Sequence, residues 1–228
     1  MSEQASLDFG GTGDGNVGQH ENFDEATVPE IQGLSYVPDF LSSAEQKRTL
    51  ETIDRSGWMD DLERAVQHYG WRYDYRSRVV TADMHIGPLP DWLNDIAQRL
   101  LSVTDSFDRV PDQAIVNNYE PGQGIAMHVD RHCFGDTVAT VSLGDTWQMD
   151  FRPLGGDRSA TVHMALAPGS ALILSGDARN LWLHGIAKRR RERCQQGGWR
   201  PRMRRVSVTF RTTVPQRVRG EDDRNFPN

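Results

Sequence analysis

Apolar residues from position 114 onward recur in short runs that Gly and Pro residues interrupt. Several of these runs alternate with polar residues, a pattern typical of strands with one buried face. Turn signals separate them at Pro121-Gly122, Gly155-Gly156 and Pro168-Gly169. We therefore predict strands over residues 114–120, 125–130, 137–143, 146–152, 160–166, 170–175, 180–187 and 203–213.

Two helices are predicted before these strands. Ser42 and Glu45 have the spacing of a capping box, and the helix that they begin is expected to run to about Ile53. A second helix is expected from Asp91 to about Val103, where apolar residues recur at helical spacing: Leu93, Ile96, Leu100 and Leu101.

These elements predict a mainly β fold with flanking helices. Eight short strands with Gly and Pro punctuation are typical of a double-stranded β-helix, or jelly roll, here with helices covering its outer face. We expect a single domain at residues 26–214, with an N-terminal helical and lid region (lid at about 58–88) and the jelly-roll core at about 114–214. Residues 1–25, rich in Gly, Asp and Asn, are predicted to be disordered, and residues 215–228 to form a flexible tail.

The composition is that of a globular protein. Of its 228 residues, 37% are hydrophobic and 25% are charged, and the length suits one domain. No run of about 18 apolar residues exists, and the chain does not begin with a basic and then apolar signal, so we expect neither membrane insertion nor secretion. Two cysteines, Cys133 and Cys194, give no disulfide framework. We therefore expect a cytoplasmic protein, and a monomer.

A candidate metal site consists of two histidines and one carboxylate. His128 and Asp130 are two residues apart on a predicted strand, so their side chains would point to the same side, and His184 would join them from another strand. Such a face holds non-haem Fe(II) and leaves three positions open for a keto acid and O2, whereas a closed zinc site requires four protein ligands. The alternative is that His-x-Asp is a chance pair on a surface strand.

The last predicted strand has two different faces. Arg205, Ser207, Thr209 and Arg211 share one face, and apolar residues share the other. An ordinary half-buried strand explains the alternation equally well. Arg205 and Arg211 lie roughly 20 Å apart along a strand, at about 3.3 Å per residue, so we assign Arg205 to the distal carboxylate of a diacid and Arg211 to the metal end or to a supporting role. Asn117 and Tyr119 share a strand face and offer further hydrogen bonds.

The net charge of −6 is unevenly distributed. Residues 1–63 carry a net charge of −11, and residues 188–219 carry +11. Within the second range, the basic segment 188–193 contains Arg189 and Arg190 between two strand-like stretches. It is either a solvated hairpin tip or a surface that follows nucleic-acid phosphates beside the metal.

Six short motifs occur in order over residues 114–214. They are Asn-x-Tyr-x-Pro-Gly at 117–122, His-x-Asp at 128–130, Ser-Leu-Gly at 142–144, Gly-x-x-Arg at 176–179, His-Gly-Ile at 184–186 and Arg-x-Ser-x-Thr-Phe-Arg at 205–211. Over this part, nearly half of the chain, the sequence resembles the AlkB-like family of Fe(II)/2-oxoglutarate-dependent dioxygenases. The resemblance implies Fe(II) at His128, Asp130 and His184, O2 as a co-substrate, and 2-oxoglutarate at Asn117, Tyr119, Arg205, Ser207 and Arg211.

The same resemblance suggests candidate residues for substrate binding. The segment before the jelly roll is a nucleotide-recognition lid in this family. Here it contains His68 and three aromatic residues that would share one strand face, either as a stacking platform for a base or as ordinary core: Trp71, Tyr73 and Tyr75. Arg179 is a further candidate. His132 stands where DNA-repair members have an acidic residue that reads the base, and a structural role for it is equally open.

The predicted function follows from these features. We expect oxidative demethylation of alkylated bases in nucleic acid, as in dealkylation repair, with release of succinate, CO2 and formaldehyde; the oxidant would form at the iron, without a protein nucleophile. Residues 121–125, 150–151 and 181–186 look closer to the branch of the family that contains a tRNA wobble-uridine hydroxylase. Hydroxylation or demethylation of a tRNA base or of a protein side chain therefore remains an alternative, as does a non-catalytic binding module.

Overall fold

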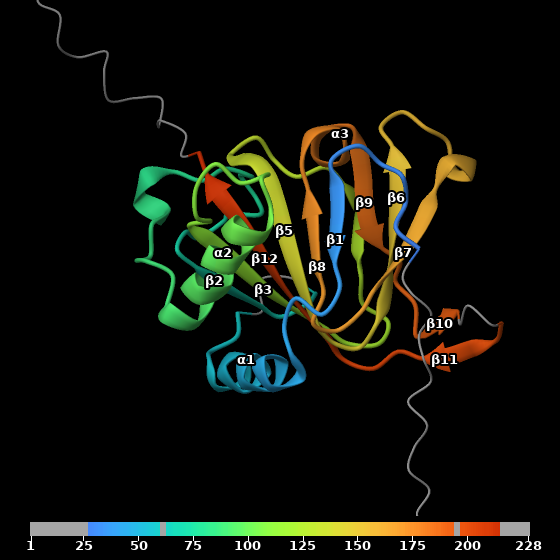
Figure 1. Cartoon of the computed structure of the whole chain (residues 1–228), viewed down its shortest axis with the longest axis horizontal. Helices are drawn as coiled ribbons and strands as arrows, with labels where there is room; N and C mark the ends of the chain where they lie inside the picture. Colours follow the sequence, from blue (N-terminus) through green and yellow to red (C-terminus); the bar gives the residue numbers. More distant parts are fainter. Residues whose placement is uncertain (1–26, 60–62, 194–196, 215–228) are drawn as a thin grey trace, which may run out of the picture.

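The computed structural model describes residues 27–59, 63–193 and 197–214, so the predicted tails at 1–25 and 215–228 lie outside the described residues. Two antiparallel sheets dominate the fold (Figure 1). The larger contains β1 (Leu34–Val37), β2 (Val66–Tyr69), β3 (Gln113–Tyr119), β5 (Phe134–Gly144), β8 (Ala171–Leu174) and β12 (Arg205–Thr213), in the order β1-β8-β5-β12-β3-β2. The smaller contains β4 (Ile125–His128), β6 (Trp147–Pro153), β7 (Val162–Leu166) and β9 (Trp182–Ile186), in the order β4-β9-β6-β7. The predicted mainly β jelly roll is confirmed.

Two helices cover the outer face of the larger sheet. α1 (Ser43–Arg55) begins with the predicted capping box, in which Ser42 N donates to Glu45 Oε2 at 2.8 Å. α2 (Asp91–Val103) has the predicted bounds. In Figure 1 α2 lies over β12, β5 and β3, and α1 lies below the lower ends of these strands. The apolar faces of both helices share one buried cluster with that sheet. None of the described helices is long and apolar enough to cross a membrane.

The alternation along β12 separates this outer core from the space between the sheets. Val206, Val208 and Phe210 are fully buried among the helix residues. A second apolar cluster fills much of the space between the two sheets, with Trp147 and Phe151 from β6 and Leu172 and Leu174 from β8. Successive side chains of a strand point to opposite faces, so the polar residues of β12 face this inner side, between the sheets.

The strand predicted at 180–187 is shorter than expected. Its first part belongs to α3 (Gly176–Asn180), which Gly176 begins with a φ of 48°. Similarly, β4 ends at His128, so Asp130 lies in the loop that follows the strand.

The expected strand face of Trp71, Tyr73 and Tyr75 is wrong. Trp71 forms one isolated bridge with His85, and the chain then turns. Asp74 accounts for the turn, because its carboxylate accepts hydrogen bonds from Arg76 N at 2.8 Å and Ser77 Oγ at 2.6 Å. Such side-chain bonds to nearby backbone compete with strand pairing.

Four short strands were not predicted. β1 and β2 form the two edges of the larger sheet. β10 (Arg191–Arg193) and β11 (Trp199–Pro201) form a separate antiparallel pair between β9 and β12. Two 3-10 turns, η1 (Ala82–Met84) and η2 (Arg158–Ala160), complete the described elements.

Candidate active site

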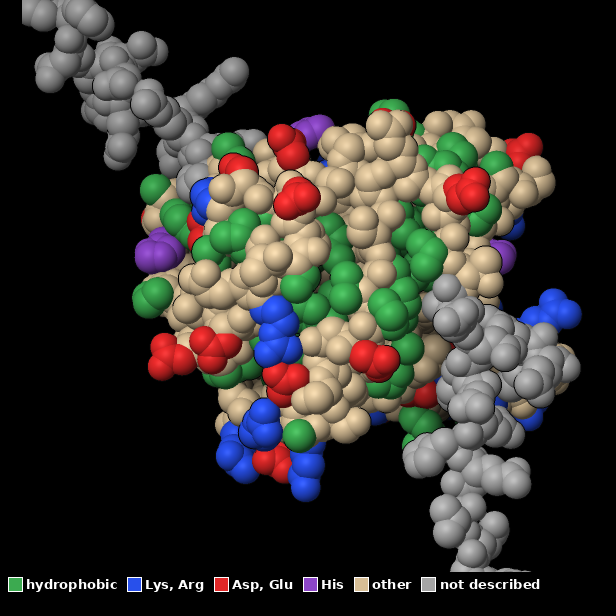
Figure 2. Space-filling view, viewed as in Figure 1, with side chains coloured by type: hydrophobic (Ala, Val, Ile, Leu, Met, Phe, Trp, Pro, Cys, Tyr) green, Lys and Arg blue, Asp and Glu red, His purple; other side chains and the backbone are tan. Residues whose placement is uncertain are grey.

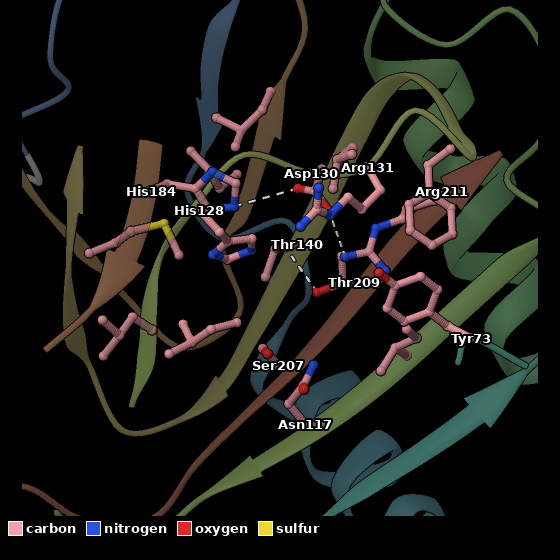
Figure 3. A pocket seen from close by; sticks show the side chains of 18 of the residues that line it. Tyr73, Asn117, His128, Asp130, Arg131, Thr140, His184, Ser207, Thr209 and Arg211 are labelled. Carbon is pink, nitrogen blue, oxygen red and sulfur yellow. Dashed lines mark hydrogen bonds and ion pairs between the residues drawn. The ribbon is translucent and has the colours of Figure 1, made fainter. Parts of the chain in front are cut away.

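A cavity of about 270 Å³ lies between the two sheets. Its walls come from both sheets, from the loop after β4 and from the segment between α1 and α2. Figure 3 shows His128, Asp130 and His184 at one side of it and the polar side chains of β12 along another. The candidate metal and co-substrate residues all line it: Asn117, Tyr119, His128, Asp130, His184, Arg205, Ser207 and Arg211.

His128 and His184 are brought together by strand pairing. They are direct partners in the register of β4 and β9, and their ring centroids lie 4.4 Å apart. Gly185 permits this approach, because a Cβ there would come within 2.9 Å of Ile125 O and Met127 N. The ligand atoms of the two histidines and Asp130 lie within 4.8 Å of one another.

Asp130 reaches the histidines although it lies outside the strand. The Arg179 guanidinium fixes the backbone of this loop, with Nη1 donating to Asp130 O at 2.9 Å and Nη2 to Arg131 O at 2.8 Å. The Asp130 carboxylate accepts a hydrogen bond from Arg211 Nη2 through Oδ1 at 2.8 Å and turns Oδ2 toward His184 Nε2 at 3.5 Å. Backbone and side chain are therefore held by two different arginines.

The protonation states of Asp130 and His184 suit a metal. Burial raises the pKa of Asp130, but Arg211 and the two histidines outweigh it and hold the pKa well below its usual value. Burial and the neighbouring His128 lower the pKa of His184 to about 3, so its imidazole is neutral at pH 7. His128 Nδ1 lies 2.8 Å from Ala126 O, which leaves Nε2 for a ligand. One carboxylate and two imidazoles match the donor set of non-haem Fe(II).

Arg205 is a buried cation without an acidic partner among the described residues. Its side chain is 1% exposed, Nη2 donates to Ser142 Oγ at 2.9 Å, and Nε has no hydrogen-bond partner. Burial lowers its pKa to about 10, so it remains charged at pH 7. A buried, uncompensated guanidinium is costly unless an anion joins it, and a carboxylate of 2-oxoglutarate fits this requirement.

Arg64 is a cavity residue that the sequence interpretation missed. Its Nε donates to Asn117 Oδ1 at 2.8 Å, and its guanidinium lies 5.6 Å from the Tyr119 ring centroid, the same distance as Arg205. Gln123 Nε2 holds the preceding residue by donating to Glu63 O at 2.8 Å. No periodic pattern marks this loop, so only the fold reveals the contact.

The predicted lid residues divide into two groups. Tyr73 and Tyr75 line the cavity, with ring centroids 5.0 Å apart. Burial raises the pKa of both hydroxyls, which therefore stay protonated at pH 7. Trp71 instead packs against a buried cluster around Cys133, and His68 Nδ1 accepts a hydrogen bond from Tyr73 N at 3.3 Å, outside the cavity lining.

Four other substrate candidates do not line the cavity. Arg179, at 1% exposed, supports the Asp130 loop. His132 is exposed on the loop surface, Arg189 pairs with the buried Glu192, and Arg190 packs near Gly122. Several residues that were not predicted do line the cavity, among them Arg64, Arg78, Arg131 and Thr140. Arg131 directly follows Asp130 in the sequence, which was the one available signal for it.

Known proteins resemble the chain in sequence and fold. It is 35% identical over 170 residues to the tRNA (carboxymethyluridine(34)-5-O)-methyltransferase ALKBH8 of Mus musculus, covering 69% of this chain and 24% of that protein. It is 33% identical over 202 residues to the alkylated DNA repair protein ALKBH8 homolog of Arabidopsis thaliana, covering 79% of this chain and 58% of that protein. The chain thus spans about a quarter and somewhat over half of these two relatives.

Fold similarity and a family model complete the comparison. The structure of OsALKBH1 superposes with a TM-score of 0.61 at 18% identity, covering 82% of this chain and all of that one, which shows the shared fold. The model of the 2OG-Fe(II) oxygenase superfamily matches residues 33–211. The chain therefore belongs to the 2OG-Fe(II) oxygenase superfamily, within its AlkB-like family, and its cofactor set is Fe(II), 2-oxoglutarate and O2.

Proposed function

We propose that this oxygenase acts on alkylated bases of nucleic acid and removes the alkyl group by oxidation, as in dealkylation repair. One observation carries the proposal: the candidate triad, the unpaired Arg205 and the Tyr73 and Tyr75 rings line one cavity. The cavity thus has room for an anionic co-substrate at one side and for a flat, aromatic substrate at another.

Each group has a distinct part in this proposal. His128, Asp130 and His184 would hold Fe(II), and Arg211 keeps Asp130 ionised and oriented. Arg205 would bind the distal carboxylate of 2-oxoglutarate through charge-assisted hydrogen bonds, with further hydrogen bonds from the cavity wall: Asn117, Tyr119 and Ser207. When bound, Fe(II), 2-oxoglutarate and O2 supply the oxidation of a substrate C–H bond, with succinate and CO2 as co-products.

The substrate side of the cavity suits an extruded base. Enzymes that modify bases read a flipped base by stacking and by hydrogen bonds, and Tyr73 and Tyr75 present rings and protonated hydroxyls to the cavity. Three arginines at its wall would contact the flanking phosphates: Arg64, Arg78 and Arg131. We propose that the segment at about 58–88, which supplies the tyrosines and two of the arginines, is the lid over the substrate.

A tRNA base is the second candidate substrate. The Mus musculus relative is named for an activity on carboxymethyluridine(34) of tRNA, and the aligned part covers 69% of this chain. The Arabidopsis relative, by contrast, is named as an alkylated DNA repair protein. The two reactions differ in product, because a hydroxylated N-methyl group is lost as formaldehyde, whereas a hydroxyl on a ring or side-chain carbon stays.

The experiment compares methylated single-stranded oligonucleotides, methylated peptides and bulk tRNA as substrates, with Fe(II), 2-oxoglutarate and O2. Mass spectrometry of the substrate and a formaldehyde assay are the measurements, and His128→Ala is the inactive control. Formaldehyde release from methylated oligonucleotides is the expected result. A mass gain of one oxygen on tRNA without formaldehyde would favour the second candidate, and oxidation of peptides alone would contradict both.

The proposal also includes a reducing, cytoplasmic compartment and a monomeric state. The compartment is supported by the buried thiol of Cys133, whose pKa burial raises, and by the oxidisable Fe(II) that His128, Asp130 and His184 would hold. Size-exclusion chromatography with light scattering tests the monomer, and cell fractionation tests the compartment.

A further inference from the structure

The hairpin of β10 and β11 has one face against the jelly roll and one face in solvent. It connects β9, which carries His184, to β12, which carries Arg205, and it projects beyond the two sheets (Figure 1). None of its residues within 191–193 and 199–201 lines the cavity. Its function is therefore separate from metal and 2-oxoglutarate binding.

The inner face of the hairpin is fixed by buried ion pairs. Glu192, at 4% exposed, accepts a hydrogen bond from Arg202 Nε at 2.8 Å, and Arg202 lies 4.0 Å from the Trp147 ring centroid of β6. Arg200 binds both carboxylate oxygens of Asp145 at 2.9 Å. These contacts set the orientation of the hairpin, so its outer face is presented without rearrangement.

The outer face pairs arginines with exposed rings. In the strand register Arg193 lies opposite Trp199 and Arg191 opposite Pro201, and paired residues share one side of an antiparallel ladder. Trp199 is 57% exposed, and Met203 beyond it is 65% exposed. Neither Arg191 nor Arg193 has an acidic partner in the part of the chain that the structure describes. Figure 2 shows Lys and Arg side chains projecting around this hairpin.

We infer that the outer face of the β10 and β11 hairpin binds a single-stranded stretch of nucleic acid next to the target nucleotide, an inference that rests on the proposed function. Arg191 and Arg193 would contact phosphates, and a base would stack on Trp199. Proteins that bind single strands without sequence preference combine cationic and aromatic side chains in this way. Negatively charged peptides would also be attracted to the arginines, but they offer no ring to Trp199.

The position of the hairpin outside the cavity makes substrate length the discriminating variable. On this inference a methylated trinucleotide would occupy the cavity alone, whereas an oligonucleotide of about 15 nucleotides, near the upper site size of single-strand binding folds, would also reach the hairpin. Hairpin variants should therefore lose turnover on the long substrate and retain it on the short one.

The test measures binding of a fluorescent oligonucleotide of about 15 nucleotides by anisotropy over a range of salt concentrations. Arg191→Ala/Arg193→Ala should weaken binding about tenfold and flatten the plot of log K against log salt by about 1.4, at roughly 0.7 per phosphate contact of a single strand. Trp199→Ala should weaken binding about tenfold with an unchanged slope, and Trp199→Phe should restore most of it. Lys47→Ala/Arg48→Ala on α1 removes the same charge from two exposed side chains elsewhere and should bind as wild type.

Two results would overturn the inference. One is wild-type affinity and salt slope in the Arg191/Arg193 variant. The other is a pair of observations: poly-glutamate displaces the labelled oligonucleotide as well as unlabelled oligonucleotide does, and Trp199→Ala leaves binding unchanged. Together these would show that the face binds polyanions in general. Because binding is measured without catalysis, a failure of the proposed function, seen as no oxidation of nucleic acid of either length, is distinguishable from a failure of the hairpin.

Discussion

Arg211 and Asp130 form an ion pair of 2.8 Å inside the cavity, and it occupies only one oxygen of the carboxylate. The other oxygen faces His184 at 3.5 Å. Arg211 thus keeps Asp130 ionised and points its free oxygen toward the neighbouring imidazole. It lies on the polar face of β12 with Arg205, yet the two arginines have different partners, because Arg205 donates to Ser142 Oγ.

Substitution of Arg211 should weaken the metal site without removing a candidate ligand. In Arg211→Ala, Asp130 loses its oriented partner, and we expect metal affinity to fall about 10- to 100-fold, as for the loss of other groups that orient metal ligands. Anaerobic titration with Fe(II) or Co(II) measures this. Arg211→Lys should restore part of the affinity, because it keeps the charge but not the planar fork. Wild-type affinity in Arg211→Ala would contradict the role.

The unpaired charge of Arg205 predicts opposite effects on stability with and without co-substrate. Without 2-oxoglutarate, Arg205→Met should be as stable as wild type or more stable, because it removes a buried cation whose desolvation is uncompensated. With 2-oxoglutarate, wild type should gain stability in proportion to ligand saturation, and the variant should gain much less.

Thermal unfolding with and without 2-oxoglutarate measures both effects of Arg205→Met. The KM for 2-oxoglutarate should also rise about 10- to 100-fold, the loss expected for a hydrogen bond to a charged group. Arg204→Met is the matched control, since Arg204 precedes Arg205 in the sequence, is partly exposed and pairs with Asp54. A variant that 2-oxoglutarate stabilises as strongly as wild type would show that Arg205 does not bind it.

The candidate triad predicts complete loss of turnover from any single substitution. His128→Ala, Asp130→Ala and His184→Ala should each reduce succinate formation to background, because a three-ligand site has no protein donor to spare. His163→Ala is the control: this histidine pairs with Asp150 on the exposed side of β6 and β7. Succinate formation is measured with Fe(II), 2-oxoglutarate and a verified substrate. Turnover at the wild-type rate in all three variants would contradict the assignment.

The sequence predicted those parts of the site that strand periodicity places. Asn117 and Tyr119 on β3, and Arg205, Ser207 and Arg211 on β12, line the cavity because alternate residues share a strand face. Asp130 was assigned to the site by strand geometry that does not apply to it, since β4 ends at His128. It arrives there because Arg179 holds the loop, a contact between distant segments that no local pattern contains.

Loops and charged strands account for the remaining errors. A turn at Asp74 stands where a strand was predicted in the segment at about 58–88, and Tyr73 and Tyr75 line the cavity whereas Trp71 does not. The β10 and β11 hairpin lacks a hydrophobic face, because its buried side is made of ion pairs. Hydrophobic periodicity could therefore predict a basic loop there, but not its strands or which arginines are exposed.

The capping box of α1 predicts a defined dependence of stability on pH. Hydrogen bonds from Arg99 and Ser42 lower the pKa of Glu45 from 4.5 to about 2. Because the folded pKa is the lower one, Glu45 stabilises the fold fully above its unfolded pKa of 4.5, and this contribution is lost as the pH falls toward about 2. We expect Glu45→Gln to cost about 1 kcal/mol at pH 7, since a cap and a partly exposed ion pair are lost.

The difference between Glu45→Gln and wild type should shrink as the pH is lowered from 5 to 3, because over this range the unfolded wild-type chain takes up a proton at Glu45, whereas the folded protein, with its pKa of about 2, remains mostly ionised. Urea unfolding of both proteins at each pH measures it. Glu51→Gln is the matched control: its carboxylate lies 3.7 Å from Arg55 on the solvent side of the same helix, and the substitution should have almost no effect at either pH. A Glu45→Gln deficit that stayed constant across this range would mean that packing, and not the ionised carboxylate, accounts for the contribution of Glu45.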